Sequence, residues 1–306
     1  MPLLSKNMEK ALYCTSYAQE RFLFLEEYEL GTSTYNIPLY LPLTDDLDKE
    51  KLIEALRCVM QRHEVLRTRF VLDNTGSYFQ EVCLDGFLSI EEQVDPNEFV
   101  HRSFNLKKEV PLRAGFFENY LLIVVHHIVF DAWSDRIFKE EIWKYYNQKK
   151  LLPLKIQYKD FAAWQRKQVE SRWDELRDYW KQRLSGMEIL QLPTDYPRPS
   201  HSNYQGTSIT FALPFEIQFF SQHHQTTLFT TCLTALGLLL SRYTGQKDLV
   251  IGTPVANRQH PQLAPLIGFF LNILVIRLSI EDQSFIDLLN QVQLDLIEAQ
   301  TYQDMP

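Results

Sequence analysis

The chain has 306 residues, 45% of them hydrophobic, which is enough to build one large or two ordinary globular domains. Acidic residues outnumber basic ones by 39 to 31, and the net charge of −8 argues against a nucleic-acid partner, which would need a basic face. The four cysteines lie far apart without a CxxC pair, so nothing supports a zinc site or a disulfide framework, and a reducing cytoplasm is favoured. No apolar run approaches the roughly 20 residues of a membrane-spanning helix, and the first ten residues lack the apolar core of a signal peptide.

The first part of the chain alternates between helical and strand-like patterns, which predicts an α/β fold. A capping-box spacing, SYAQ at residues 16–19, precedes an apolar stretch that runs to residue 25. Hydrophobic periodicity predicts helices over residues 47–66, 134–146 and 158–184. Strands are expected over residues 77–84 and 88–94, followed by a hairpin over residues 116–125 with a short turn at 118–119.

A proline-rich segment, LPTDYPRP at residues 192–199, interrupts this pattern. Proline cannot continue a helix and holds its neighbour extended, so we expect a connector there. The predicted division is an N-terminal lobe over residues 1–190 and a C-terminal lobe over residues 191–306. In the second lobe we expect a strand at 208–213, two helices of which the second covers 229–243, buried strands at 249–252 and 272–280, and a last helix at 285–301.

The segment LLIVVHHIVFDAWS, residues 121–134, carries the strongest chemical signal. Side chains alternate along a strand, so His126 and His127 face opposite ways and cannot bind one metal ion together. One of them can line a cavity while the other packs inside. Asp131 stands just before a helix, where it can pair with an arginine or cap the helix. Taken alone, a histidine in an apolar strand also suits a buried, hydrogen-bonded core position.

Six ordered motifs resemble those of the condensation domains of nonribosomal peptide synthetases. They are SYAQERFLFL at 16–25, RHEVLRTRF at 62–70, HHIVFDAWS at 126–134, YKDFAAW at 158–164, IGFFLN at 267–272 with Arg277, and QDMP at 303–306. The resemblance covers the whole chain. It implies an α/β fold of two chloramphenicol-acetyltransferase-like lobes in a V, with a tunnel between them.

The resemblance also implies a reaction. An upstream carrier protein presents a peptidyl or aminoacyl thioester, and the free amine of an aminoacyl thioester on a downstream carrier attacks it. Both substrates hang on phosphopantetheine arms of these partners, a neighbouring adenylation domain loads them, and the domain itself binds no cofactor and no metal. The opening SYAQ favours the subtype that joins an L-configured donor to an L-configured acceptor.

Each part of the HHxxxD motif receives a role from the same resemblance. His127 faces the tunnel, as a base or as a positioning group, and His126 is its structural partner. Asp131 forms an ion pair that shapes the site. The arginines considered for that pair are Arg67 or Arg62 first, and then Arg258. The residues expected to line the tunnel are Ala132, Trp133, Ser134 and Asn272.

Three features depart from the family pattern. Ala132 stands where glycine is usual, beside the expected acceptor channel, and Tyr302 stands where the sixth motif usually has histidine or asparagine. Family domains also continue well beyond the sixth motif, so we expect a C-terminally truncated domain whose second lobe is incomplete. Whether this chain is active alone is therefore open.

The alternatives come from within and outside this reaction class. An epimerisation domain shares HHxxxD but has serine before tryptophan, whereas here Trp133 precedes Ser134. A coenzyme A acyltransferase would need a second motif near the C-terminus that is absent. A non-catalytic docking module, pseudo-enzyme or fragment is favoured by Ala132 and the truncation, but the intact His127 and Asp131 argue against it.

Overall fold

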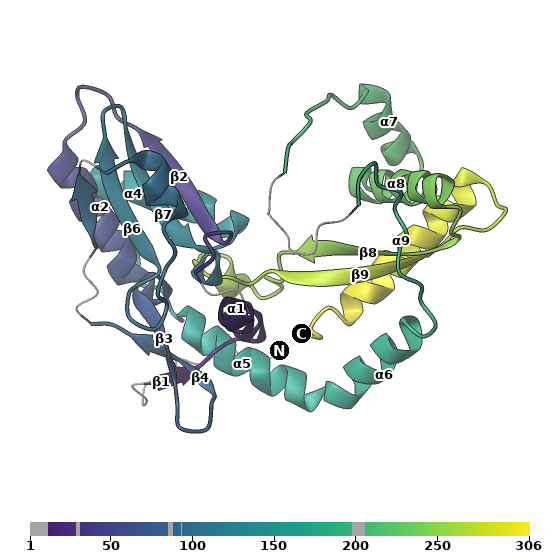
Figure 1. Cartoon of the computed structure of the whole chain (residues 1–306), viewed down its shortest axis with the longest axis horizontal. Coiled ribbons are helices and arrows are strands. Elements are labelled where there is room, and N and C mark those ends of the chain that lie inside the picture. The colour runs from purple at the N-terminus through teal and green to yellow at the C-terminus, as the bar shows by residue number, and fades with distance from the viewer. Residues whose placement is uncertain (1–11, 29–30, 85–87, 93, 198–205) are drawn as a thin grey trace. The chain divides into compact units, whose positions relative to one another are not determined.

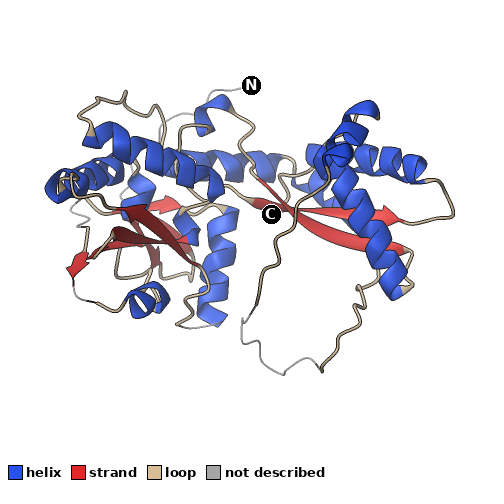
Figure 2. Cartoon of the chain, turned by 90° about the horizontal axis from the view of Figure 1, so that it is seen from above, coloured by secondary structure: helices blue, strands red, loops and turns tan. Residues whose placement is uncertain are grey.

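The computed structural model describes residues 12–28, 31–84, 88–92, 94–197 and 206–306, which form two compact units. The first unit runs to Ser171 and includes Ala256–Leu271, and the second comprises Arg172–Val255 and Asn272–Met305. These boundaries differ from the predicted division at residue 190, because residues 172–190 belong to the second unit and Ala256–Leu271 (the return segment) belongs to the first. Figure 2 shows that each unit has strands and helices of its own.

The first unit contains two sheets, one of four strands in the order β2-β7-β6-β5 and one of three in the order β1-β4-β3. The strands are β1 (Leu12–Cys14), β2 (Asn36–Pro42), β3 (Thr68–Leu72), β4 (Tyr78–Val82), β5 (Ile90–Glu92), β6 (Leu112–Phe117) and β7 (Tyr120–His126). The helices are α1 (Tyr17–Tyr28), α2 (Lys49–Arg62), α3 (Pro96–His101), α4 (Ala132–Tyr146) and α5 (Tyr158–Ser171), with short 3₁₀ turns η1 (Glu64–Arg67), η2 (His127–Val129) and η3 (Pro261–Leu263).

Strand β7 is the centre of this unit, because the side chains from Leu121 to His126 are all buried. It pairs antiparallel with β2 on one side and with β6 on the other. Helices α2 and α4 lie side by side in the same unit (Figure 1) and contribute apolar side chains to one core with β7. The return segment joins this core through Leu263, Leu266, Ile267, Phe269 and Phe270.

The second unit has one antiparallel pair of strands, β8 (Asp248–Val255) and β9 (Asn272–Ser279), and the helices α6 (Trp173–Arg183), α7 (Phe215–His223), α8 (Leu228–Thr244) and α9 (Phe285–Thr301) (Figure 1). Burial alternates along β9, from Leu274 to Ile276 to Leu278, as a strand with one covered face requires. Those three side chains form a core with Leu233 of α8 and Leu288 and Val292 of α9.

Several predicted elements are confirmed, including the β6–β7 hairpin, the helix that begins after Asp131, and the last helix at Phe285–Thr301. Three predictions are wrong. The helix expected over 47–66 ends at Arg62 and is followed by the separate turn η1. The helix expected over 158–184 is broken at Arg172 into α5 and α6, and residues 208–213 form no strand, with Ile209 and Phe211 exposed. Residues 192–197 of the expected connector have no helix or strand, and residues 198 and 199 lie outside the described part of the chain.

No sequence pattern had predicted β1, β2, β3 or α3. Strand β2 contains Pro38 and Pro42, which usually argue against a strand. Both prolines are tolerated because β2 lies at the edge of its sheet, where a missing backbone N–H costs least. Strand β1 and helix α3 have only three and six residues, too few for a hydrophobic period to be recognised. Within the described ranges, no helix is both long enough and apolar enough to cross a membrane.

Candidate functional site at the end of β7

His126 is the last residue of β7 and is 1% exposed. Its Nδ1 accepts a hydrogen bond from the backbone N–H of Ile128 at 3.1 Å, so the ring proton lies on Nε2. Nε2 in turn donates to the carboxylate of Glu26 at 3.1 Å. Burial lowers the pKa of His126, and Glu26 only partly opposes this effect. His126 is thus an inward-facing, neutral residue that fixes the turn after β7, as expected for the structural histidine.

His127 begins the η2 turn and is only partly buried. Its ring stacks on Phe22 of α1, with centroids 5.6 Å apart, and meets the edge of Phe269 from the return segment at 4.9 Å. Phe22 and Phe269 also contact each other at 4.7 Å, so the imidazole is held in an aromatic clamp. Its Nδ1 is buried and has no hydrogen-bond partner among the described residues. The clamp fixes the plane of the ring.

Asp131 is buried and combines the two roles that the sequence left open. As N-cap of α4, it accepts from the backbone N–H and the hydroxyl of Ser134 at 2.8 and 2.7 Å. It also forms a buried ion pair with Arg258, with Nη2 at 3.0 and 3.1 Å from its two oxygens. A further hydrogen bond comes from the backbone N–H of Phe270 at 3.2 Å. Asp131 therefore joins the HHxxxD turn to the return segment.

The structure corrects the first expectation for the partner of Asp131, which was Arg67 or Arg62. Arg62 pairs with Glu141 of α4 at 2.9 Å, and Arg67 donates to the backbone carbonyl of Cys83 at 2.7 Å. Arg62 is the last residue of α2 and Arg67 lies in η1. Their contacts fasten this part of the chain to α4 and to the end of β4. The sequence could not show that the return segment belongs to the first unit, and Arg258 comes with it.

Arg258 lies in a cage built largely by its own segment. Its Nη1 donates to the carbonyls of Leu263 and Leu266 at 2.8 and 2.7 Å, and its guanidinium lies 3.9 Å from the centre of the Phe270 ring. Burial lowers the pKa of Arg258 and the charge of Asp131 raises it. Because an isolated buried charge is costly, Arg258 depends on Asp131 and Asp131 on Arg258.

The residues predicted to line a tunnel lie in different environments. Ser134 is fully buried, and its hydroxyl binds Asp131 and accepts from the backbone N–H of Gly268 at 3.0 Å, so it supports the site from inside rather than facing a substrate. Ala132 is exposed, and the partly exposed Trp133 donates from Nε1 to the carbonyl of Ala264 at 3.0 Å. Asn272, in the second unit, donates to the carbonyls of Gln303 and Met305 at 2.8 and 2.7 Å.

A close approach between Tyr158 and Gly268 was not foreseen, although both residues lie in quoted motifs. A Cβ atom on Gly268 would lie 2.1 Å from Cδ2 of the Tyr158 ring, so only glycine fits there. The Tyr158 hydroxyl binds the hydroxyl of Ser16 and the carbonyl of Phe269. Burial raises the pKa of this phenol, which stays protonated and can donate. Tyr158 thus holds the backbone of Phe269, whose ring contacts His127.

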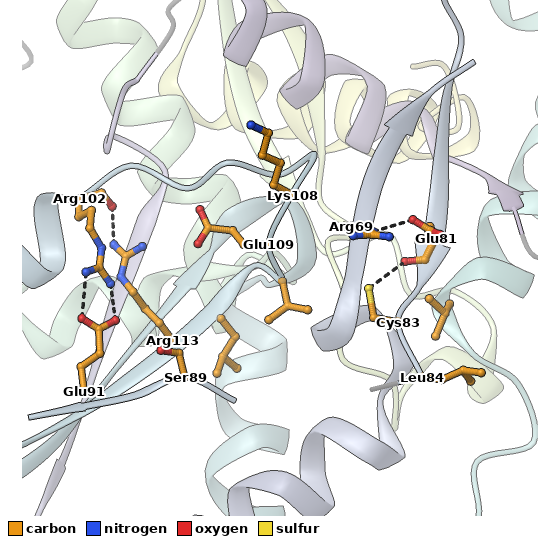
Figure 3. Close-up of a pocket in the computed structure, with 13 residues that line it drawn as sticks. Arg69, Glu81, Cys83, Leu84, Ser89, Glu91, Arg102, Lys108, Glu109 and Arg113 are labelled. Carbon is orange, nitrogen blue, oxygen red and sulfur yellow. Dashed lines mark hydrogen bonds and ion pairs between the residues drawn. The ribbon is translucent and has the colours of Figure 1, made fainter. Parts of the chain in front are cut away.

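A cavity of about 640 Å³ lies elsewhere in the first unit, among residues of β3 to β6 and their loops (Figure 3). Its charged side chains largely neutralise one another. Arg69 pairs with Glu81 at 2.6 Å, and Arg102 binds Glu91 through two hydrogen bonds at 2.6 and 2.9 Å. The cavity does not include His127 and is not the candidate site. Among the described residues there is also no group of three histidines, cysteines or carboxylates placed to hold a metal ion.

A family model for the condensation domain matches residues 9–306. The chain belongs to the condensation-domain family. Similar curated proteins include malpinin synthetase of Mortierella alpina, 36% identical, and N-(5-amino-5-carboxypentanoyl)-L-cysteinyl-D-valine synthase of Penicillium rubens, 34% identical. Each alignment covers 95% of this chain but only 4% and 9% of those proteins, so the chain spans less than a tenth of their length.

Solved structures support the same fold. The complex of the X-domain and OxyB from teicoplanin biosynthesis matches with a TM-score of 0.89 at 23% identity, covering 100% of this chain and 74% of that chain. The condensation domain of the monacolin K polyketide synthase matches with a TM-score of 0.79 at 23% identity, covering 98% and 75%. The predicted α/β fold class of the condensation domains is therefore confirmed.

Proposed function

We propose that this condensation domain forms an amide bond between two thioester-bound substrates, with His127 as the catalytic residue. The observation that carries the proposal is the aromatic clamp at the end of β7. It holds a partly exposed imidazole in one plane, with Nδ1 buried and without a hydrogen-bond partner among the described residues. The proposal therefore assigns the substrate contact to Nε2. Membership of the condensation-domain family supports the choice of reaction.

In the proposed reaction, the amine nitrogen of the acceptor attacks the carbonyl carbon of the donor thioester. The new C–N bond forms, the C–S bond breaks, and the donor thiol leaves. Because a thioester is already activated, holding the two substrates in line can supply much of the acceleration, with effective molarities of about 10⁵ M or more. The amine must also lose a proton, and Nε2 of His127 contacts it. Such a contact is worth roughly 10²–10⁴-fold in rate.

The partners in this proposal are two carrier proteins whose phosphopantetheine arms present the donor and the acceptor, with an adenylation domain that loads them. The names of the similar synthases and synthetases support this context. We further propose an L-configured donor, substrate contacts by Ala132, Trp133 and Asn272, and a cytoplasmic site of action. The domain then needs no cofactor of its own.

The test is an assay with one carrier loaded with a donor aminoacyl thioester and a second loaded with an acceptor. We expect His127→Ala to lower the rate of dipeptidyl-thioester formation by about 10²-fold or more without changing the melting temperature. His101→Ala is the matched control, since the His101 side chain is exposed and its ring bonds to the carbonyl of Asn97 within α3. A His127→Ala rate close to that of the parent would overturn the role of His127. Inversion at the donor α-carbon without amide formation would instead identify an epimerisation domain.

A further inference from the structure

His63 is a buried histidine outside the HHxxxD motif, at the C-terminal end of α2, and it is 1% exposed. Both of its ring nitrogens are engaged. Nε2 lies 2.9 Å from a carboxylate oxygen of Glu141 in α4, and Nδ1 accepts a hydrogen bond from the backbone N–H of Ile267 at 3.2 Å. A side chain at the end of α2 thereby holds the backbone of the return segment.

These contacts allow only one protonation state. The N–H of Ile267 can only donate, so Nδ1 must carry the lone pair and Nε2 must carry the proton that it gives to Glu141. The second oxygen of Glu141 accepts from Nε of Arg62 at 2.9 Å, which fixes the carboxylate. Burial lowers the pKa of His63, and Arg62 and Arg258 act in the same direction against the opposing charge of Glu141. The neutral form is therefore favoured.

Ile267 is two residues from Phe269, whose ring closes the clamp on His127. Gly268, between them, is pinned against Tyr158 and accepts no side chain. A change in the position of the Ile267 backbone is thus passed to Phe269 with little slack. Other ties to the return segment come from Asp131, Trp133, Ser134 and Tyr158.

We propose that His63 is a positioning residue for amide-bond formation: its neutral imidazole sets the backbone of Ile267 and, through Phe269, the plane of His127. The role rests on the proposed function of His127. The rate should therefore depend on the hydrogen-bond acceptor that His63 Nδ1 offers to Ile267, and not on the contact of Nε2 with Glu141.

Two substitutions separate these contacts. In His63→Asn, the amide oxygen lies near the place of Nδ1 and can accept from Ile267, but the side chain is too short for Glu141. In His63→Gln, the amide nitrogen reaches Glu141, but no acceptor stands near Ile267. We expect His63→Gln to lower kcat by about 10- to 100-fold, because small misplacements in a site have such effects, and His63→Asn to rescue most of that loss. The KM for either carrier should change little in both variants.

The matched control is His260→Gln. His260 lies on the same return segment and also accepts a backbone N–H through Nδ1, from Gln262 at 3.2 Å, but this contact stays within the segment. Its replacement should leave kcat unchanged. If His63 were merely structural, the kcat values of His63→Asn and His63→Gln would follow their melting temperatures, with no specific rescue by asparagine. That result would overturn the proposal.

A second readout does not depend on activity. The ring ¹⁵N resonances of His127, identified by their loss in His127→Ala, should shift in His63→Gln and stay near the parental values in His63→Asn. If the parent forms no amide bond yet these shifts occur, the proposed function fails while the positioning by His63 stands. If neither variant folds, the ¹⁵N spectrum of the parent decides, because a proton on Nδ1 of His63 at neutral pH would refute the contact with Ile267.

Discussion

Replacing Asp131 with asparagine removes one charge from the buried pair that ties the return segment to α4. Asparagine is as good an N-cap as aspartate, so the hydrogen bond from the backbone of Ser134 is kept. The side chain of Arg258 is only 2% exposed and would keep its charge without a counterion. The substitution therefore isolates the ion pair from the cap.

The expected loss in the free energy of unfolding is about 3–5 kcal/mol, as for other buried pairs that lose one partner. Asp48→Ala gives the scale for a cap alone. Asp48 caps α2 through the backbone N–H of Lys51 at 3.0 Å and is partly exposed, so its replacement should cost only the small contribution of a helix cap. Adding Arg258→Met to Asp131→Asn removes the stranded charge, so the double variant should be more stable than Asp131→Asn alone.

Urea denaturation measures these differences, and hydrogen exchange localises them. The amide of Phe270 donates to Asp131, so it should exchange faster in Asp131→Asn while amides of β7 in the same unit change less. A loss of only about 1 kcal/mol with unchanged protection of Phe270 would refute the reasoning and reduce Asp131 to a helix cap. A double variant less stable than both single variants would refute it as well.

Gly268→Ala should cost about 1–3 kcal/mol in urea denaturation, because its Cβ would lie 2.1 Å from the Tyr158 ring, and the cost should shrink in a Tyr158→Leu background. Burial lowers the pKa of His63 and His126 below 6.5, so the unfolded chain binds more protons than the folded chain as the pH drops below about 6.5. The free energy of unfolding should therefore fall below about pH 6.5 and be flat above pH 7 with respect to both groups. His63→Asn should weaken this pH dependence. Asn272→Ala should cost about 1–3 kcal/mol for two lost hydrogen bonds and speed proteolysis just after α9, whereas equal cleavage rates would show that the amide is not needed there.

Local sequence patterns predicted the elements whose signals are local. The β6–β7 hairpin follows from its short turn between apolar runs, and α9 from the regular spacing of its apolar residues. The break at Arg172 left no such signal, because the apolar pattern continues across it. The apolar alternation at Ile209 and Phe211 is typical of a strand, but both side chains are exposed. Such alternation does not reveal whether a partner strand is present.

The candidate site divides in the same way. His126, His127 and Asp131 are close in sequence, so a short motif identified them. Strand alternation predicted that the two histidines face opposite ways, and the family resemblance assigned His126 to the inside. The partner of Asp131 could not be found by this reasoning, because Arg258 follows it by 127 residues and reaches it only when the chain returns to the first unit. Two other contacts of the site, with Phe269 and with the backbone of Phe270, come from the same return segment. Substitutions that displace the backbone of residues 267–270 should therefore be felt at His127, although that stretch lies far from it in sequence.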